Sequence, residues 1–425
     1  MVIIIITIIL ILLVLVQNWK TLNKAARRMM FLFVSYWGVA LTISSIGVPG
    51  LNTPSLFSLS MLLLSVVMFT LGFLLFKKRK YEFKPSSGDL HLLFTKIHNS
   101  KFFILLVVIA TVISIVLFAI MRVVLAQVGD LGEIRTMFYD GSLFGGAIGW
   151  VMTFFLTPIH YICIPLFGYG LFFKRDWKTI IISVFLLSYV SLSGGRFGYL
   201  RIAAGVLFVL FCMFNEIKLK RKQWMILIIS LVGLVYFMAL VSNARSVYDG
   251  SFFENTFYSF LHYLCGPMSA FDYAINNDYV RQMGGYTLGR LTFSSIDDLL
   301  YLFMRVLGFR IYNPMPALIE LKQDTQIVIG DTTWNALYTA VLYYWLDGGI
   351  IGCVLFPFLI GIGFRYLVRV FYYYRTWPFL VILALFFQVN MHSVSDFEFS
   401  SPFNLILVII LFRMGMKRRV KKIVD

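Results

Sequence analysis

The sequence predicts an all-α integral membrane protein with about 11 transmembrane helices (11–13) and one long outer loop that contains amphipathic helices. Three observations support this fold class. The 425 residues are 60% hydrophobic and only 13% charged, with a mean hydropathy of +0.85. Apolar runs of roughly 15 to 23 residues recur along the whole chain, close to the length that crosses a bilayer as a helix. Short basic clusters alternate with these runs.

The basic clusters set the predicted orientation. They lie directly beside apolar runs: Lys77, Lys78, Arg79 and Lys80; Lys218, Lys220, Arg221 and Lys222; Lys417, Arg418, Arg419, Lys421 and Lys422. This is the positive-inside pattern, and it attracts anionic lipid headgroups. The net charge of +17 is therefore interpreted as membrane-related, and nucleic acid is excluded as a partner.

Taken in order, the predicted spans are 2–17, 29–48, 57–76, 102–124, 148–171, 179–193, 197–215, 224–242, 350–368, 377–391 and 402–414. The run from Val2 has no basic residues before it and no small-residue cleavage site after it, which predicts an uncleaved first span with an outside N-terminus. The predicted organisation is 1–242 (the first eight transmembrane helices), 243–349 (the long outer loop) and 350–425 (the last three helices and a basic cytoplasmic tail).

The outer loop is expected to be helical and associated with the membrane. The stretches 252–264, 291–308 and 333–346 each place apolar residues at helical spacing opposite a polar face. We expect them to lie on, or dip into, the outer membrane surface. The alternative is that two of them span the membrane fully, with the same sidedness. Residues 313–316 (Asn-Pro-Met-Pro) predict a turn.

No metal or cofactor site is predicted. Cys163, Cys212 and Cys353 lie in or beside apolar runs, Cys265 stands alone in the outer loop, and no CxxC spacing occurs. The sequence also lacks DxD and HExxH motifs, and residues 49–57 carry no charge. The uncharged first outer loop argues against lipid-sugar glycosyltransferases that carry an acidic motif there.

Four arginines at the outer ends of spans are candidates for binding a diphosphate: Arg122, Arg196, Arg201 and Arg245. A guanidinium stays charged and presents a planar fork that matches phosphate oxygens. Arg196 follows Gly194 and Gly195, which let backbone N–H groups approach an anion. The alternative is headgroup anchoring or ion pairing with loop acids, and for Arg122 this alternative is preferred.

A second set of polar residues precedes the span at 350–368. Arg290, Asn335 and Asp347 are candidates for either a structural or a sugar-binding role. The residue types around Asn335 and Asp347 are also typical of helix ends, with Asp331 or Thr332 as an N-cap and Asp347-Gly348 as a C-terminal break.

The last outer loop, residues 392–398, combines one imidazole and two carboxylates. His392, Asp396 and Glu398 are therefore the candidate catalytic acids or bases. The alternative is that these three polar side chains only keep a short loop in contact with water. His160 and His262 also face outward in this topology, and we interpret both as packing residues.

The chain resembles the Wzy-type repeat-unit polymerases that build O-antigen and capsule polysaccharides in bacteria, and more distantly the O-antigen ligases. Three segments carry the resemblance: Ser191-Leu192-Ser193-Gly194-Gly195-Arg196, Asn335-Ala336-Leu337-Tyr338 and Asp347-Gly348-Gly349-Ile350-Ile351-Gly352. The plan of many spans with one long, late outer loop is also similar.

The resemblance implies a metal-independent glycosyltransferase of the bacterial cytoplasmic (inner) membrane, with the C-terminus in the cytoplasm. Its substrate would be an undecaprenyl-diphosphate-linked oligosaccharide, whose units it joins on the outer face, with the outer helices cradling sugar and polyprenyl. It would need no cofactor, and a chain-length regulator and a flippase would be its protein partners. The alternatives are a ligase, or a non-enzymatic transporter of lipid-linked oligosaccharide.

Overall fold

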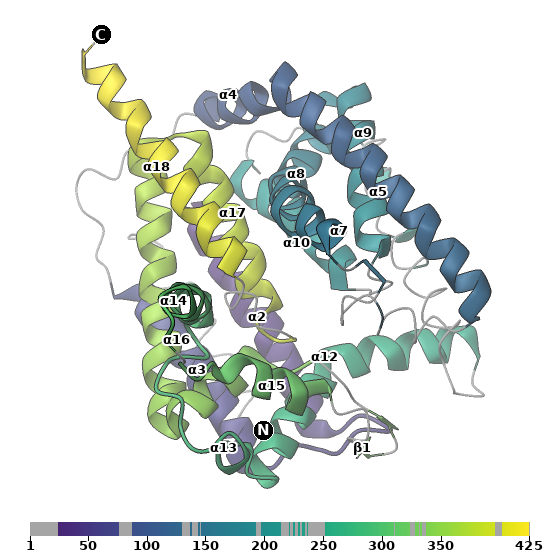
Figure 1. The fold of residues 1–425 in the computed structure, drawn as a ribbon, viewed down its shortest axis with the longest axis vertical. Helices are drawn as coiled ribbons and strands as arrows, with labels where there is room; N and C mark the ends of the chain where they lie inside the picture. Colours follow the sequence, from purple (N-terminus) through teal and green to yellow (C-terminus); the bar gives the residue numbers. More distant parts are fainter. Residues whose placement is uncertain are drawn as a thin grey trace. The chain divides into compact units, whose positions relative to one another are not determined.

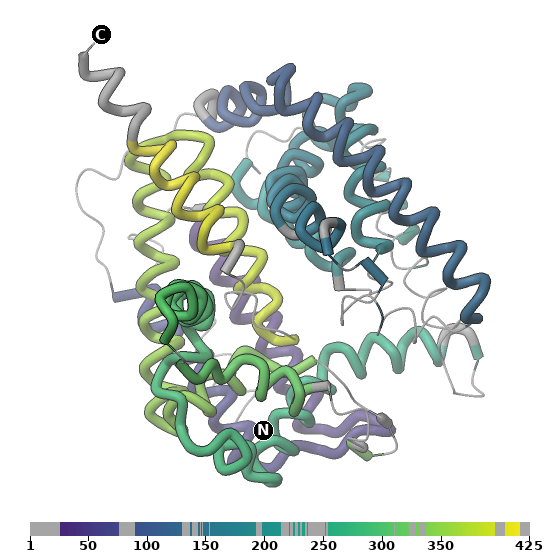
Figure 2. Tube along the Cα trace, viewed as in Figure 1, coloured from purple at the N-terminus to yellow at the C-terminus, as the bar shows by residue number. Residues whose placement is uncertain are grey.

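The computed structural model describes residues 24–75, 87–129, 137, 143–144, 146–192, 197–213, isolated positions between 221 and 236, 251–309, 311–323, 328–330, 332–333, 337–395 and 402–424 (Figure 1, Figure 2). Within these residues the fold is helical apart from one two-stranded antiparallel hairpin. The predicted all-helical class is confirmed for this part of the chain.

The α-helices are α2 (Lys24–Ile46), α3 (Leu56–Leu74), α4 (Ser87–His98), α5 (Lys101–Val128), α7 (Ala147–Val151), α8 (Thr157–Tyr169), α9 (Trp177–Leu192), α10 (Phe197–Met213), α12 (Phe252–Asn276), α13 (Tyr279–Gln282), α14 (Ser294–Val306), α15 (Pro314–Gln323), α16 (Ala340–Tyr374), α17 (Trp377–His392) and α18 (Pro402–Val424). Two π-helical turns, Met152–Leu156 and Gly170–Lys174, continue the helix at either end of α8. The strands are β1 (Val328–Ile329) and β2 (Thr332–Thr333).

Five helical stretches in the described residues are long and apolar enough to cross a membrane: Ala26–Ile46, Leu56–Leu74, Lys101–Val128, Ile148–Lys174 and Ala340–Tyr374. Shorter apolar helices occur at Trp177–Leu192, Gly198–Met213, Trp377–His392 and Asn404–Met416. These helices support a multi-pass membrane protein. The predicted span at 2–17 lies outside the described residues, as does most of the span at 224–242, so the number 11 stays a prediction.

The chain divides into two compact units. Unit 1 contains residues 1–82, 242–370 and 389–408, and unit 2 contains residues 83–241, 371–388 and 409–425. The long outer segment that was singled out in the sequence therefore belongs to unit 1, together with α2, α3 and most of α16.

The core of unit 1 contains a close crossing of α3 and α16. The Ser65 hydroxyl donates to the carbonyl oxygen of Cys353 at 3.1 Å. A Cβ added at Gly361 would lie 2.2 Å from the carbonyl oxygen of Phe69, so only glycine fits there. Contacts advance along both helices in the same order, which means that α3 and α16 run in the same direction.

Unit 2 contains a helix that the sequence did not reveal. Residues 77–101 were expected to form an inside loop, but α4 occupies part of this segment. The Phe94 ring stacks on Tyr169 with centroids 4.8 Å apart. The fully buried His98 side chain lies 3.4 Å from both Asp176 and Thr179. Burial lowers the pKa of His98, and the carboxylate of Asp176 only partly offsets this effect.

The outer segment differs from the expected pattern in three places. The stretch 252–264 is only the first half of α12, which begins with a capping box formed by Ser251 and Glu254. Residues 332–333 form a strand, so the expected helix starts later, at Ala340, and the N-cap assigned to Thr332 is wrong. Residues 313–316 do not form an isolated turn, because α15 begins at Pro314.

Candidate functional site

In unit 1, α12 binds the segment between α2 and α3, residues 47–55, with three side chains from one helical face. His262 Nε2 donates to a carbonyl oxygen of the loop at 2.7 Å, and the Ser269 hydroxyl donates to another at 2.8 Å. The Asp272 carboxylate accepts from the backbone N–H and the hydroxyl of Ser55, at 3.0 and 2.5 Å. The expected packing role of His262 agrees with this contact, and the segment before α3 is thereby fixed to the outer segment.

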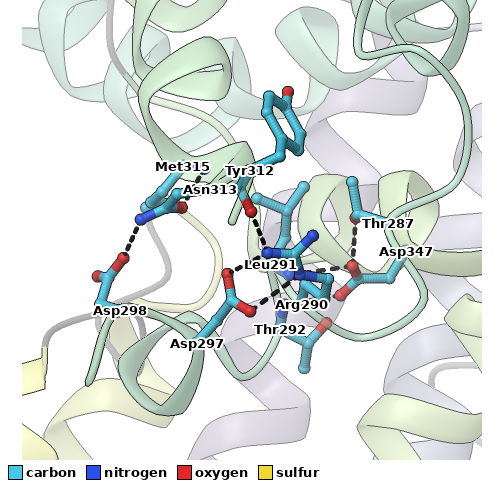
Figure 3. Close-up of polar contacts among 10 residues, drawn as sticks. All are labelled: Thr287, Arg290, Leu291, Thr292, Asp297, Asp298, Tyr312, Asn313, Met315 and Asp347. Atoms are coloured by element: carbon cyan, nitrogen blue, oxygen red, sulfur yellow. Dashed lines mark hydrogen bonds and ion pairs between the residues drawn. The ribbon is translucent and has the colours of Figure 1, made fainter. Parts of the chain in front are cut away.

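Asp347 lies where α16 changes direction, just before the non-helical Gly348 and Gly349. Its side chain is 1% exposed. The carboxylate accepts from the Thr287 hydroxyl at 2.5 Å, from the N–H of Leu291 at 3.0 Å and from the N–H of Thr292 at 2.6 Å (Figure 3). These three bonds connect the carboxylate to residues 287–292, and the expected helix break is present; the choice between a structural and a sugar-binding role for Asp347 stays a prediction.

Asp347 secures a loop with an unusual backbone. Positive φ angles occur at Gly284, Gly285, Leu288 and Gly289. The N–H groups of Thr287 and Leu288 donate to the carbonyl oxygens of residues 346 and 347, each at 3.0 Å. Residues 284–292 are therefore fixed to the start of α16 through both backbone and side-chain bonds. We call residues 284–292 the latch.

Arg290 joins the latch to α14 and to the start of α15. Its Nε and Nη2 atoms bind the two oxygens of Asp297 at 2.9 and 3.1 Å, and Nη2 also donates to the carbonyl oxygen of Tyr312 (Figure 3). A bidentate pair of this kind fixes a guanidinium in one plane. The structure therefore gives Arg290 a positioning role in the outer segment, and its possible contact with sugar stays a prediction.

Next to this pair, Asp298 accepts from the side-chain amide of Asn313 at 2.7 Å. Burial raises the pKa of the Asp298 carboxyl; the Asn313 bond opposes the rise, and the neighbouring charge of Asp297 adds to it. The sequence interpretation did not single out these two acids. The available signal was their adjacency in an otherwise apolar stretch.

A buried lysine forms a second polar cluster in the outer segment. Lys322 Nζ donates to the Tyr343 hydroxyl at 2.9 Å and lies 5.2 Å from the centroid of the same ring. It is also 6.0 Å from the ring of Tyr338, whose hydroxyl is 3.3 Å from that of Tyr279. Aromatic faces and a phenol oxygen stabilise an ammonium away from bulk water. No local pattern in residues 314–323 indicates that α15 brings this lysine to α16.

The predicted catalytic loop is only partly described. His392 is the buried last residue of α17 rather than a loop residue. The next residue, Ser393, accepts from Trp37 Nε1 through its hydroxyl at 3.0 Å and from the N–H of Ala340 through its carbonyl at 2.8 Å. Asp396 and Glu398 lie outside the described residues. The roles predicted for these three candidates are untested.

The predicted diphosphate-binding arginines are also only partly visible. In unit 2, Arg122 is exposed on α5 and Arg201 is half-buried on α10. Arg196, Arg245 and Asn335 lie outside the described residues.

The helices on either side of residues 193–196 approach each other closely. The hydroxyls of Ser191 and Tyr199 are 3.0 Å apart, and a Cβ at Gly198 would lie 2.5 Å from the Val190 side chain. The ends of α9 and α10 that flank the predicted Arg196 site are thus held together.

Among the described residues, no group of three or more His, Cys, Asp or Glu side chains is arranged to hold a metal ion. Comparisons with family models, with curated proteins and with solved structures found no match.

Proposed function

We propose that this protein is a glycosyltransferase that polymerises oligosaccharide units carried on undecaprenyl diphosphate, at the outer face of a bacterial cytoplasmic membrane. In this proposal Arg196, Arg201 and Arg245, with Arg122 at the edge, bind the diphosphate. His392, Asp396 or Glu398 accepts the proton of the attacking hydroxyl. The N-terminus lies outside and the C-terminus in the cytoplasm.

The observation that carries this proposal is the construction of unit 1. The loop that precedes α3 is bound by α12, and the latch is bound by Asp347 at the kink of α16. Because α3 and α16 run in the same direction, the proposed topology puts both segments on one side of the membrane. An ordered, polar structure on one side of apolar helices suits chemistry at the membrane surface.

The chemistry needs few groups. An acceptor hydroxyl attacks the anomeric carbon of the donor, a new carbon–oxygen bond forms, and the bond to the diphosphate breaks. The proton passes to the protein base, and the electron pair leaves with undecaprenyl diphosphate. Arginines fixed near the leaving group stabilise its developing charge, which is a role that a metal ion fills in other enzymes.

The test uses purified protein in lipid nanodiscs with EDTA and an undecaprenyl-diphosphate-linked oligosaccharide, with the products separated on a gel. A ladder of multiples is expected from the wild type and from Arg221→Ala, which changes a basic residue of a predicted cytoplasmic cluster. Arg196→Ala is expected to abolish the ladder. A wild type that transfers one unit to a different acceptor would favour a ligase, and movement of the substrate without transfer would favour a transporter.

A further inference from the structure

Helix α14 has its apolar side turned away from the protein. Val306 is 85% exposed. The other residues of this face are also largely exposed: Ile296, Leu300, Leu302, Phe303 and Leu307. An amphipathic helix on a water-soluble surface shows the opposite arrangement, with its apolar stripe against the core.

The polar side of α14 is correspondingly turned toward the protein. Ser294 and Ser295 are buried, and Asp297 is 11% exposed in its pair with Arg290. Asp298 is half-buried beside Asn313. The carboxylates are therefore satisfied within the outer segment, while the leucines and phenylalanines face outward. This distribution fits a helix whose outer side meets hydrocarbon.

The latch extends the same apolar surface. Leu288 is 83% exposed and has a φ of +54°, although the backbone on both sides of it is hydrogen-bonded to the start of α16. A left-handed backbone conformation is unfavourable for leucine, and the Leu288 side chain adds to the exposed apolar patch formed by α14. The loop nevertheless presents it in a fixed position.

The location of this surface indicates what covers it. The Tyr286 hydroxyl lies 2.8 Å from the position that a Cβ would take at Gly349. The next residues of α16 are the exposed Ile350 and Ile351, at the start of the predicted span 350–368. The apolar surface of the latch and α14 is thus continuous with a predicted lipid-facing helix. Arg305, exposed in the last turn of α14, is placed to reach lipid phosphates.

We infer that the latch and α14 form a rigid wedge that inserts into the outer leaflet, with Leu288, Phe303 and Val306 among the acyl chains. The occupant of this surface is membrane lipid. Asp347 fixes the angle of the wedge because it binds three groups of the latch. Of the three stretches expected at the membrane surface, α14 shows this inverted burial, residues 252–264 of α12 leave Phe257 and Phe260 exposed, and the first turns of α16 are buried in unit 1.

The test needs no glycan substrate and is separate from the proposed function. Single cysteines replace Leu288, Val306 and, as a control, the exposed polar Asn277, in a protein whose native cysteines are replaced. Each is labelled with an environment-sensitive fluorophore in nanodiscs. Spin-labelled acyl chains are expected to quench the labels at 288 and 306 by about twofold or more and to leave the label at 277 nearly unchanged.

Two results would overturn the inference. Equal quenching at all three positions would show that the wedge does not enter lipid preferentially. Labels at 288 and 306 that are shielded from water yet not quenched by lipid would indicate a protein partner, such as a second copy. Adding Asp347→Asn is expected to lower quenching at 288 more than at 306. Unchanged quenching at both positions would refute the role of Asp347, and if this variant does not fold, Thr287→Val tests the same connection.

Discussion

Replacing Asp347 with alanine should destabilise unit 1 strongly. The substitution removes the acceptor of three hydrogen bonds at a position that is 1% exposed. The Thr287 hydroxyl can turn to the carbonyl oxygen of Leu346, which is already 3.4 Å away. The N–H groups of Leu291 and Thr292 lose the carboxylate oxygens to which they donate.

The expected magnitude follows from these two orphaned N–H groups. A buried donor without an acceptor costs about 1–3 kcal/mol, so the free energy of unfolding of the variant should fall by about 2–6 kcal/mol. In a cooperative unit of about 150–250 residues, 1 kcal/mol corresponds to a change in Tm of about 2–4 °C. The Tm of Asp347→Ala should therefore fall by about 4–24 °C. The Asp347→Asn variant keeps one acceptor oxygen, so its Tm should fall by less.

Thermal unfolding can be followed by the reaction of a thiol-specific dye with Cys265 and Cys353, which are buried in unit 1. The matched control is Glu320→Ala, which removes an exposed carboxylate from α15 in the same unit. A Tm for Asp347→Ala that equals the Tm of this control would show that the three hydrogen bonds do not hold the latch, and our reasoning would fail.

Three further substitutions test separate parts of the structure by the same thiol-reaction assay, with Cys163, which is buried in unit 2, as the reporter for His98. Gly361→Ala should lower the free energy of unfolding by about 1–3 kcal/mol because the added Cβ would overlap a carbonyl oxygen of α3. The control Gly363→Ala should be neutral because no atom lies within 4 Å of the added Cβ. Equal effects of the two substitutions would disprove the close crossing. The pKa of His98 is lowered by burial, so the unfolded chain binds more protons below about pH 6.5 and stability should fall from pH 7.5 to 5.5. His98→Gln should flatten this slope, and an unchanged slope would contradict the assignment. Arg290→Gln should lower the free energy of unfolding by about 1–2 kcal/mol because it leaves the carboxylate of Asp297 without its charged partner. Arg305→Gln should have little effect because Arg305 is exposed. The reverse order would argue against the bidentate pair.

Much of the helical layout could be predicted from the sequence because lipid imposes a simple rule. A segment that crosses hydrocarbon must satisfy its own backbone and be apolar over its length, so α3 and α5 begin and end within a few residues of the predicted spans. Helix α4 was missed because its 12 residues mix charged and apolar side chains without such a run. Its position depends on the Phe94–Tyr169 stack, which joins residues far apart in the sequence.

The candidate site was harder to predict because its contacts are not local. The Asp347-Gly348 pair correctly indicated a helix break, but nothing near it in the sequence named Thr287 as its partner, 60 residues earlier. The same holds for Lys322 and Tyr343, which meet only because α15 packs against α16. Local sequence patterns identify where helices begin, end or break, whereas tertiary packing decides which polar groups come into contact.

Helix α14 shows why burial adds information that periodicity lacks. The pattern of residues 291–308 reveals two faces but does not say which face the protein covers. In the structure, Arg290 and Asn313 bind the two carboxylates of α14, so the polar face is turned toward the protein and the apolar face stays exposed. In water this arrangement would expose leucine and phenylalanine side chains at a cost of about 1.5–3 kcal/mol for each one that could otherwise be buried. The cost disappears if the surrounding medium is hydrocarbon, and the inverted helix is therefore evidence about the medium as much as about the fold.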